Sequence, residues 1–302
     1  MKKDDGIYAE TLMRSGVDEI WKRTQDPALH KLWDLRFSDI EYIPKKSEDE
    51  QQKLLYITHL GFGMRIEGEG ESTGTATDDE GRATSALRFW SADRKSLIEE
   101  GSGYWRYVPS AEGTRFLTWY DYRTRFGALG RFVDRLVYRP FLRWATAWSF
   151  DRLRLWIDEG VHPRTTANLA VIHAVARLGI VFTWLWHGLV PKVIFAHADE
   201  QTMMIEAGLS VALLPLVGVS EALIGVAGLV LWNWRAFFLL NVLLMFVTLG
   251  SVAVTSPWYL KGAFNPVTLN SGMIVMSIVG YLAASGMPSA ARCIRRQSKE
   301  EA

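Results

Sequence analysis

The chain has very little cysteine, a single Cys293 in 302 residues. One thiol cannot form an internal disulfide, and it supplies neither a redox pair nor a cysteine-rich metal site. The N-terminus, from Met1 to Asp5, also lacks the apolar core and small-residue cleavage site of a secretory signal. We therefore expect no metal site and a first domain that stays in the cytoplasm.

Charge is scarce in the second half of the chain. Between residues 1 and 160 charged side chains recur every few positions, but 207–232 carries only Glu221 and 236–259 carries none. Such a contrast indicates that the two halves of the chain lie in different solvents, water and lipid. We predict a soluble domain over 1–160, a linker over 161–166, a membrane domain over 167–287 and a basic cytoplasmic tail over 288–302.

Four apolar segments are long enough to cross a bilayer, which takes about 20 residues for ~30 Å of hydrocarbon. We place them at 167–190, 208–232, 236–257 and 265–287. The second and third are separated only by a short polar turn, which predicts a tight helical hairpin. The sequence therefore predicts an all-α four-helix transmembrane bundle with the lipid bilayer as its first partner.

The orientation of the bundle follows from the lysines and arginines in its short loops. Arg235 and the basic tail share one side by parity with the end of the first domain, whereas the other side holds only Lys192 and Lys261. We therefore expect both termini in the cytoplasm and the protein in the inner membrane of a bacterium.

The first membrane segment contains a polar face. At 100° per residue, His173, Arg177, Trp184 and His187 lie on one side of the helix. An arginine at mid-membrane costs ~2.5 to 3.5 kcal/mol on insertion scales, so we expect it to face the bundle interior. Counting residues from the helix ends puts Glu221 at a matching depth, and we predict that Arg177 and Glu221 pair.

Two interpretations of this pair stay open. It can be a buried structural pair that fixes helix register, or part of a polar site for a lipid head group, a quinone or a proton. Asn241 and Asn270 can extend the polar interior. The two histidines lie about 21 Å apart along one helix, so they cannot share a metal.

This half of the chain resembles the DoxX-like membrane family. The resemblance is carried by Arg177, the run from Phe182 to Lys192, the Gly218 to Glu221 stretch and the Phe264 to Asn270 stretch. It implies a four-helix membrane bundle, and members of the family have been linked to quinone-dependent oxidation and redox homeostasis. The resemblance therefore implies quinone as a possible cofactor and a redox protein as a possible partner.

The first half has the pattern of an antiparallel sheet. A strand over 7–13 and a short helix over 17–25 precede strand-like runs at 40–45, 54–67, 70–77, 84–91, 103–109 and 115–125. In the last run Phe116, Thr118, Tyr120 and Tyr122 alternate onto one face. A helical stretch from 129 to about 159, with Pro140 starting a second segment, ends the domain.

This order resembles the helix-grip fold of the polyketide-cyclase and START-related superfamily (SRPBCC, Bet v1-like). The carrying residues are the stretch from Trp21 to Phe37 and the helix stretch from Arg139 to Arg152. The resemblance implies an α+β domain whose sheet wraps a long C-terminal helix around a hydrophobic cavity. We predict a ligand pocket lined by four aromatic side chains, Trp33, Tyr120, Tyr122 and Trp148.

No paired carboxylates, Ser/His/Asp grouping or phosphate-binding glycine loop stands out, so catalytic residues are unknown and a binding protein is favoured over an enzyme. Our leading hypothesis is a membrane protein that binds a lipid or quinone through a cytoplasmic pocket coupled to a polar site in the bundle. The alternatives are a subunit of a quinone-linked redox complex and a non-catalytic assembly or stress scaffold. We expect no nucleic-acid partner.

Overall fold

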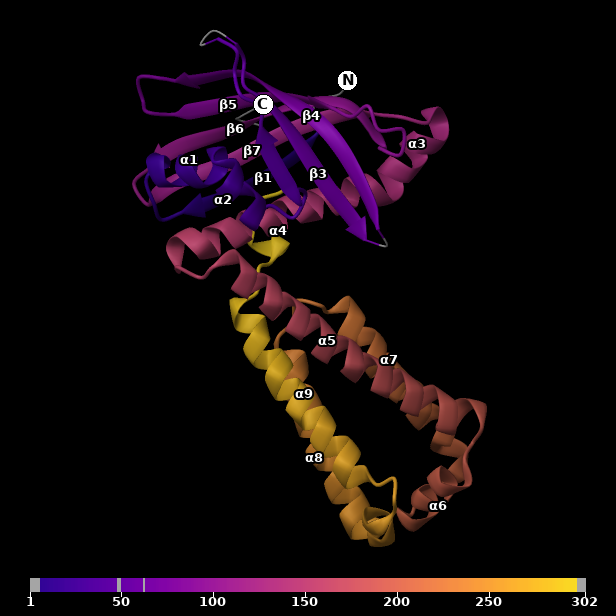
Figure 1. Cartoon of the computed structure of the whole chain (residues 1–302). Coiled ribbons are helices and arrows are strands. Elements are labelled where there is room, and N and C mark those ends of the chain that lie inside the picture. Colours follow the sequence, from indigo (N-terminus) through magenta and orange to yellow (C-terminus); the bar gives the residue numbers. More distant parts are fainter. Residues whose placement is uncertain (1–5, 48–49, 62, 298–302) are drawn as a thin grey trace. The chain divides into compact units, whose positions relative to one another are not determined.

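The computed structural model describes residues 6–47, 50–61 and 63–297, and it divides into two compact units (Figure 1). The soluble unit comprises residues 1–166 together with 288–302, and the membrane unit comprises residues 167–287. The tail that follows the last membrane helix is thus part of the soluble unit.

The soluble unit is built on an antiparallel seven-stranded sheet. Its strands are β1 (Ile7–Met13), β2 (Asp39–Tyr42), β3 (Lys53–Gly61), β4 (Met64–Thr77), β5 (Ala83–Trp90), β6 (Ile98–Ser110) and β7 (Gly113–Thr124). Their order is β1-β7-β6-β5-β4-β3-β2, so each strand from β2 to β6 pairs with its successor, and β1 pairs with β7 at the edge opposite β2. This confirms the predicted sheet.

One predicted strand boundary was wrong. A single strand over 54–67 was expected, but the chain reverses near Gly63, which has a φ of +76° that glycine adopts easily, and β4 then runs unbroken from Met64. Gly68, which falls between the predicted strands over 54–67 and 70–77, lies inside β4 instead. A Cβ placed there would meet the ring of Tyr56 at 2.1 Å, so the glycine makes room for an aromatic side chain on the neighbouring strand.

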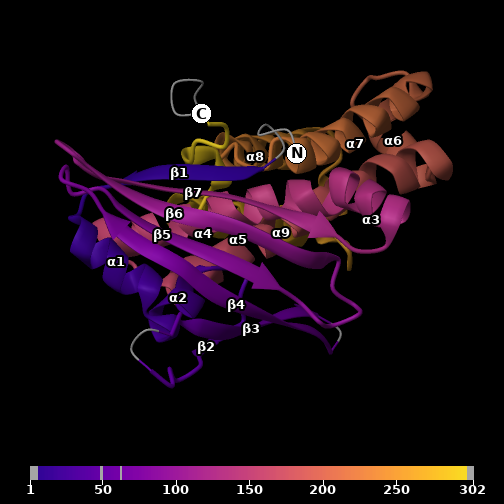
Figure 2. The ribbon, with the colours of Figure 1, turned by 90° about the horizontal axis from the view of Figure 1, so that it is seen from above.

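Helices cover one face of the sheet (Figure 2). Two short helices, α1 (Val17–Gln25) and α2 (Pro27–Trp33), follow β1, and Asp26 caps α2 by accepting a hydrogen bond from the N–H of Ala28. Helix α2 was not predicted, because Asp26 and Pro27 are typical of the end of a helix such as α1, whereas here they also begin one.

The long C-terminal helix is interrupted near its start. It consists of α3 (Gly127–Val133), a π-helical turn η2 (Asp134–Tyr138) and α4 (Arg139–Asp158) with Pro140 in its first turn. Phe150 of α4 stacks on Phe116 of β7 with ring centroids 4.6 Å apart, in a core that also buries Trp33 and Tyr107 completely. A sheet closed on one face by a long C-terminal helix is the architecture of the helix-grip fold.

The tail packs on this same unit. A short 3-10 turn, η6 (Ala290–Arg292), places the backbone N–H of Ser289 and the guanidinium of Arg292 against the buried carboxylate of Asp151, at 2.8 and 2.9 Å. Ile294 then pairs with Glu10 at the free edge of β1 through two backbone hydrogen bonds of 2.9 Å.

The membrane unit contains four helical segments long and apolar enough to span a bilayer, counted over the described residues. They are built from α5 (Pro163–Gly188) continued by η3 (Leu189–Ile194); η4 (Val211–Leu213) with α7 (Leu214–Val230); α8 (Ala236–Thr255); and α9 (Pro266–Gly286). A short helix, α6 (Ala198–Glu206), and a 3-10 turn, η5 (Pro257–Lys261), lie in the loops. The predicted four-helix membrane architecture is confirmed.

Candidate functional site

Arg177 is completely buried on α5 and holds the C-terminal end of α7. Its guanidinium donates to the carbonyl oxygens of Gly228, Leu231 and Trp234, each at 2.9 Å. The last carbonyls of a helix have no hydrogen-bond partner inside the helix and carry a partial negative charge. An arginine there donates the missing hydrogen bonds and supplies an opposite charge. Arg177 therefore fixes the turn between α7 and α8.

The predicted pair between Arg177 and Glu221 was wrong. Glu221 lies instead 3.0 Å from the Nζ of Lys192. The helix register explains the difference: a Cβ on Gly188 would be 2.5 Å from the carbonyl oxygen of Gly218, so Glu221 lies opposite the end of α5. That level is eleven residues beyond Arg177, roughly 16 Å at 1.5 Å per residue. Counting from assumed helix ends placed the two helices in the wrong register.

His173 lies one turn before Arg177 and is 1% exposed. Its ring packs edge-on against Trp232 and Phe238, with centroids 5.4 Å away in both cases. Neither of its ring nitrogens, nor the Nε of Arg177, has a hydrogen-bond partner among the described residues. Buried polar groups without a partner are uncommon and costly. This corner of the bundle therefore offers polar groups for a partner from outside the chain.

A second polar line crosses the bundle interior. The indole N–H of Trp184 donates to the Oδ1 of Asn241 at 2.7 Å, and the Nδ2 of Asn241 donates to the hydroxyl of Ser277 at the same distance. Asn270 is not part of it, since its amide donates to Met245 O and to Thr248 Oγ1. The sequence thus predicted that Trp184, Asn241 and Asn270 are polar residues of the bundle interior. The structure places Trp184 and Asn241 in one hydrogen-bonded group and Asn270 in another.

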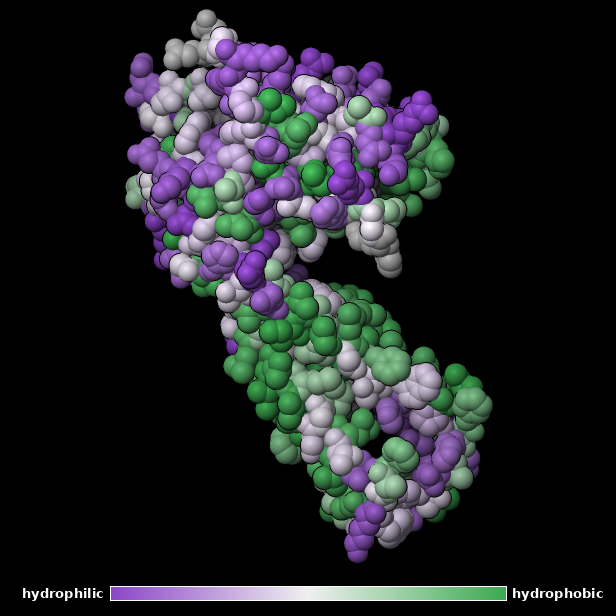
Figure 3. Space-filling view, in the orientation of Figure 1, coloured by the Kyte–Doolittle hydropathy of each residue, from purple (hydrophilic) through white to green (hydrophobic). Residues whose placement is uncertain are grey.

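A charged cluster missed by the sequence analysis closes the α6 end of the bundle. The Nζ of Lys192 is buried 3.0 Å from Glu221, 3.2 Å from Glu200 of α6, and 3.3 Å from the carbonyl oxygen of His187, whose ring is half-buried. Figure 3 shows a hollow with a hydrophilic rim at this end of the bundle. Lys192 was predicted to lie in the loop after the first membrane segment, but η3 continues the helix through it.

The four predicted pocket residues of the soluble unit are all buried. The indole of Trp33 donates to Arg23 O at 3.0 Å, the hydroxyls of Tyr120 and Thr146 lie 2.9 Å apart, and Tyr122 donates to Asp134 at 2.5 Å. Arg152 lies over the ring of Trp148. Two open depressions in the described part of this unit lie elsewhere, beside the β6–β7 turn. A shared pocket for the four aromatics stays a prediction.

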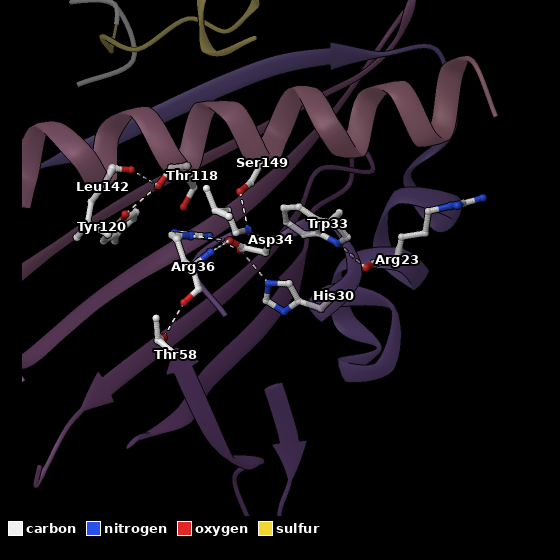
Figure 4. A network of polar contacts seen from close by, with 12 residues as sticks. Arg23, His30, Trp33, Asp34, Arg36, Thr58, Thr118, Tyr120, Leu142 and Ser149 are labelled. Carbon is white, nitrogen blue, oxygen red and sulfur yellow. Dashed lines mark hydrogen bonds and ion pairs between the residues drawn. The ribbon is translucent and has the colours of Figure 1, made fainter. Parts of the chain in front are cut away.

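Between the sheet and α4 lies a buried charged network, shown in Figure 4. Asp34 accepts two hydrogen bonds from the guanidinium of Arg36, at 2.9 and 2.6 Å, and lies 3.0 Å from the Nε2 of His30. Burial by itself raises the pKa of Asp34, but the charge and hydrogen bonds of Arg36 outweigh it and hold that pKa well below its usual range. Burial also lowers the pKa of His30.

The described residues contain no group of three or more His, Cys, Asp or Glu side chains placed to hold a metal. The candidate site is the corner formed by His173 and Arg177, whereas the Lys192 cluster is a separate group of ion pairs in η3 and its neighbours. Its chemistry is hydrogen bonding and charge within an aromatic surround.

Four apolar helices that follow an α+β unit define a two-part integral membrane protein. Residues 181–278 match the DoxX-like family. The uncharacterised membrane protein YndG of Bacillus subtilis is 45% identical over 183 residues, which cover 60% of this chain and 68% of YndG. The chain belongs to the DoxX-like family.

Solved structures similar to the soluble unit include two from bacteria. A STAR-related lipid transfer protein from Xanthomonas axonopodis is 16% identical, with 47% of this chain and 83% of that one covered and a TM-score of 0.36. The Zhui aromatase/cyclase from Streptomyces sp. R1128 is 14% identical, with 49% and 95% covered and a TM-score of 0.34.

Proposed function

We propose that this chain is a membrane protein that binds a hydrophobic small molecule, a lipid or a quinone, with the polar head of that molecule at His173 and Arg177. The observation that carries the proposal is the set of three buried nitrogens without a partner, Nδ1 and Nε2 of His173 and Nε of Arg177. A carbonyl or phosphate oxygen would satisfy the donors among them and remove the cost of burying them unpaired.

The surroundings of these nitrogens favour a ligand with an apolar body. Trp232 and Phe238 flank the imidazole edge-on, and the guanidinium carbon of Arg177 lies 4.9 Å from the ring centroid of Phe237. Aromatic walls with a few polar groups are typical of small-molecule sites. A quinone head and a lipid carbonyl share the accepting oxygen that the site requires, so the test must separate them.

Packing of the tail supports the proposed topology. Ser289, Arg292 and Ile294 contact the soluble unit, and two segments in contact must lie on the same side of the membrane. Together with the bias of lysine and arginine, this favours a cytoplasmic location for both termini in an inner membrane. The soluble unit would then supply the second, cytoplasmic binding surface, through the proposed pocket at Trp33, Tyr120, Tyr122 and Trp148.

The test is to identify small molecules that co-purify with the protein in a mild detergent, by untargeted mass spectrometry. We expect one lipid or quinone species near one per chain in the unaltered protein and in a His187→Phe control, and several-fold less in His173→Phe. Equal content in all three would overturn the proposed site. Co-purification of an oxidoreductase instead would support the redox-subunit alternative.

A further inference from the structure

The stretch from Phe126 to Trp144 leaves an unusual amount of apolar surface uncovered. Eight large apolar side chains there are at least 40% exposed, whereas only four others with that exposure are scattered over the rest of the described soluble unit. The most exposed are Leu129 at 69%, Leu136 at 65% and Phe132 at 64%. Contiguous exposed apolar surface on a soluble domain usually marks a surface that something else covers.

The exposed charges on this stretch have one sign. Arg131 and Arg135 are exposed, and neither forms an ion pair with any part of the chain that the structure describes. The only acidic residue, Asp134, is 5% exposed and is occupied by Tyr122 and Arg139. The exposed side of α3 and η2 therefore combines apolar side chains with unopposed positive charge.

This combination matches the interface of an anionic bilayer. Helices that lie in a membrane surface bury an apolar face among the head groups and keep lysine or arginine against the negative lipids. The chain itself keeps a bilayer near the soluble unit, because only residues 159–162 separate the end of α4 from the start of α5, the first membrane-spanning helix. An acidic protein could also bind such a surface. We favour the bilayer, because the membrane-spanning helices attach every copy of the soluble unit to one.

We propose that α3 and η2 form an interfacial anchor, which inserts Leu129, Phe132 and Leu136 among the head groups of anionic lipids while Arg131 and Arg135 contact phosphate. The interrupted helix suits this role. The π-helical turn lets Asp134 turn inward to Tyr122 and Arg139 while the residues around it stay exposed. The anchor would hold the soluble unit against the bilayer independently of any ligand at His173.

The test uses the full-length chain in lipid nanodiscs. Cys293, the sole cysteine, is replaced by alanine, and an environment-sensitive fluorophore is attached at Leu136→Cys. The matched control is Leu55→Cys on β3, another exposed leucine of the soluble unit. Quenching of each probe by lipids with a doxyl group near the head group is compared in phosphatidylcholine and in a mixture with about 30% phosphatidylglycerol.

We expect the Leu136 probe to be quenched at least twofold more than the Leu55 probe, and more strongly with phosphatidylglycerol. Replacement of Arg131 and Arg135 by glutamine should abolish the response to phosphatidylglycerol. Equal quenching at both positions would overturn the anchor, as would energy transfer between copies with no lipid quenching, which would assign the surface to a second copy. An identical response in the double glutamine variant would overturn the role of the arginines.

Discussion

Arg177 donates a hydrogen bond of 2.9 Å to the carbonyl oxygen of Gly228, a residue on a different membrane helix and 51 positions later in the sequence. Two more carbonyls after Gly228 accept from the same guanidinium. In a bilayer, backbone groups at the end of a helix have no water to replace a lost partner. These hydrogen bonds therefore give the buried Arg177 a structural role, next to the His173 ring that has no hydrogen-bond partner among the described residues.

Replacement of Arg177 by methionine should destabilise the membrane unit. Hydrogen bonds to charged groups are worth about 1.5 to 3 kcal/mol each, and three are lost together, so we expect a loss of at least 3 kcal/mol. Unfolding in mixed detergent micelles, followed by tryptophan fluorescence, measures it. Arg177→Lys should recover only part of the loss, because one ammonium cannot span three carbonyls. A stable methionine variant would contradict the capping role.

The Lys192–Glu221 contact should show up as coupling in a double-mutant cycle. We expect Lys192→Met and Glu221→Gln to be non-additive by about 1 to 3 kcal/mol, because each single change leaves the other charge buried without its partner. The matched cycle between Arg177→Met and Glu221→Gln should be additive within about 0.5 kcal/mol. Strong coupling in this second cycle would restore the pairing that the sequence suggested.

Close contact between α5 and α7 depends on glycine. A Cβ on Gly188 would meet Gly218 O at 2.5 Å and Ala222 N at 2.7 Å, both backbone atoms that cannot move aside easily. Gly188→Val should therefore separate the helices and lower folded yield several-fold in detergent, as judged by size-exclusion chromatography. Gly250→Val is the control, since nothing lies within 4 Å of a Cβ there. Equal yields would contradict this register.

Acid should destabilise the soluble unit. The folded pKa of His30 is below its ordinary value, so the unfolded chain takes up that proton first and stability falls as the pH drops below about 6.5. The folded pKa of Asp34 is also lowered, so its contribution is present above about pH 4 and is lost at lower pH. His30→Gln should flatten the fall in melting temperature between pH 6.5 and 5, and His59→Gln, at an exposed residue of β3, is the control that should keep the fall of the unaltered protein.

Much of the fold could be predicted because period and run length are local properties of the sequence. The apolar runs gave four spans, and the alternation from Phe116 to Tyr122 gave a strand with a buried face. Partners across the bundle could not be predicted this way, because they depend on helix register. Glu221 was paired with Arg177, but it lies at the level of Gly188, eleven residues farther along the first membrane helix, and contacts Lys192. The exposure of Leu129 and Phe132 could not be predicted either. Helical spacing identifies an apolar face of a helix but not the surface that covers it.

The most direct test of the central claim is photo-crosslinking of a diazirine-bearing quinone analogue to the purified chain, with the labelled peptides mapped by mass spectrometry. The account predicts saturable labelling of α5 around His173 and of the turn that contains Trp232, competed by the unmodified analogue and lost in His173→Phe. A lipid analogue with the same reactive group separates the two ligand classes by which one competes. Labelling that neither analogue saturates, or that falls around Lys192 and α6 and survives His173→Phe, would contradict it.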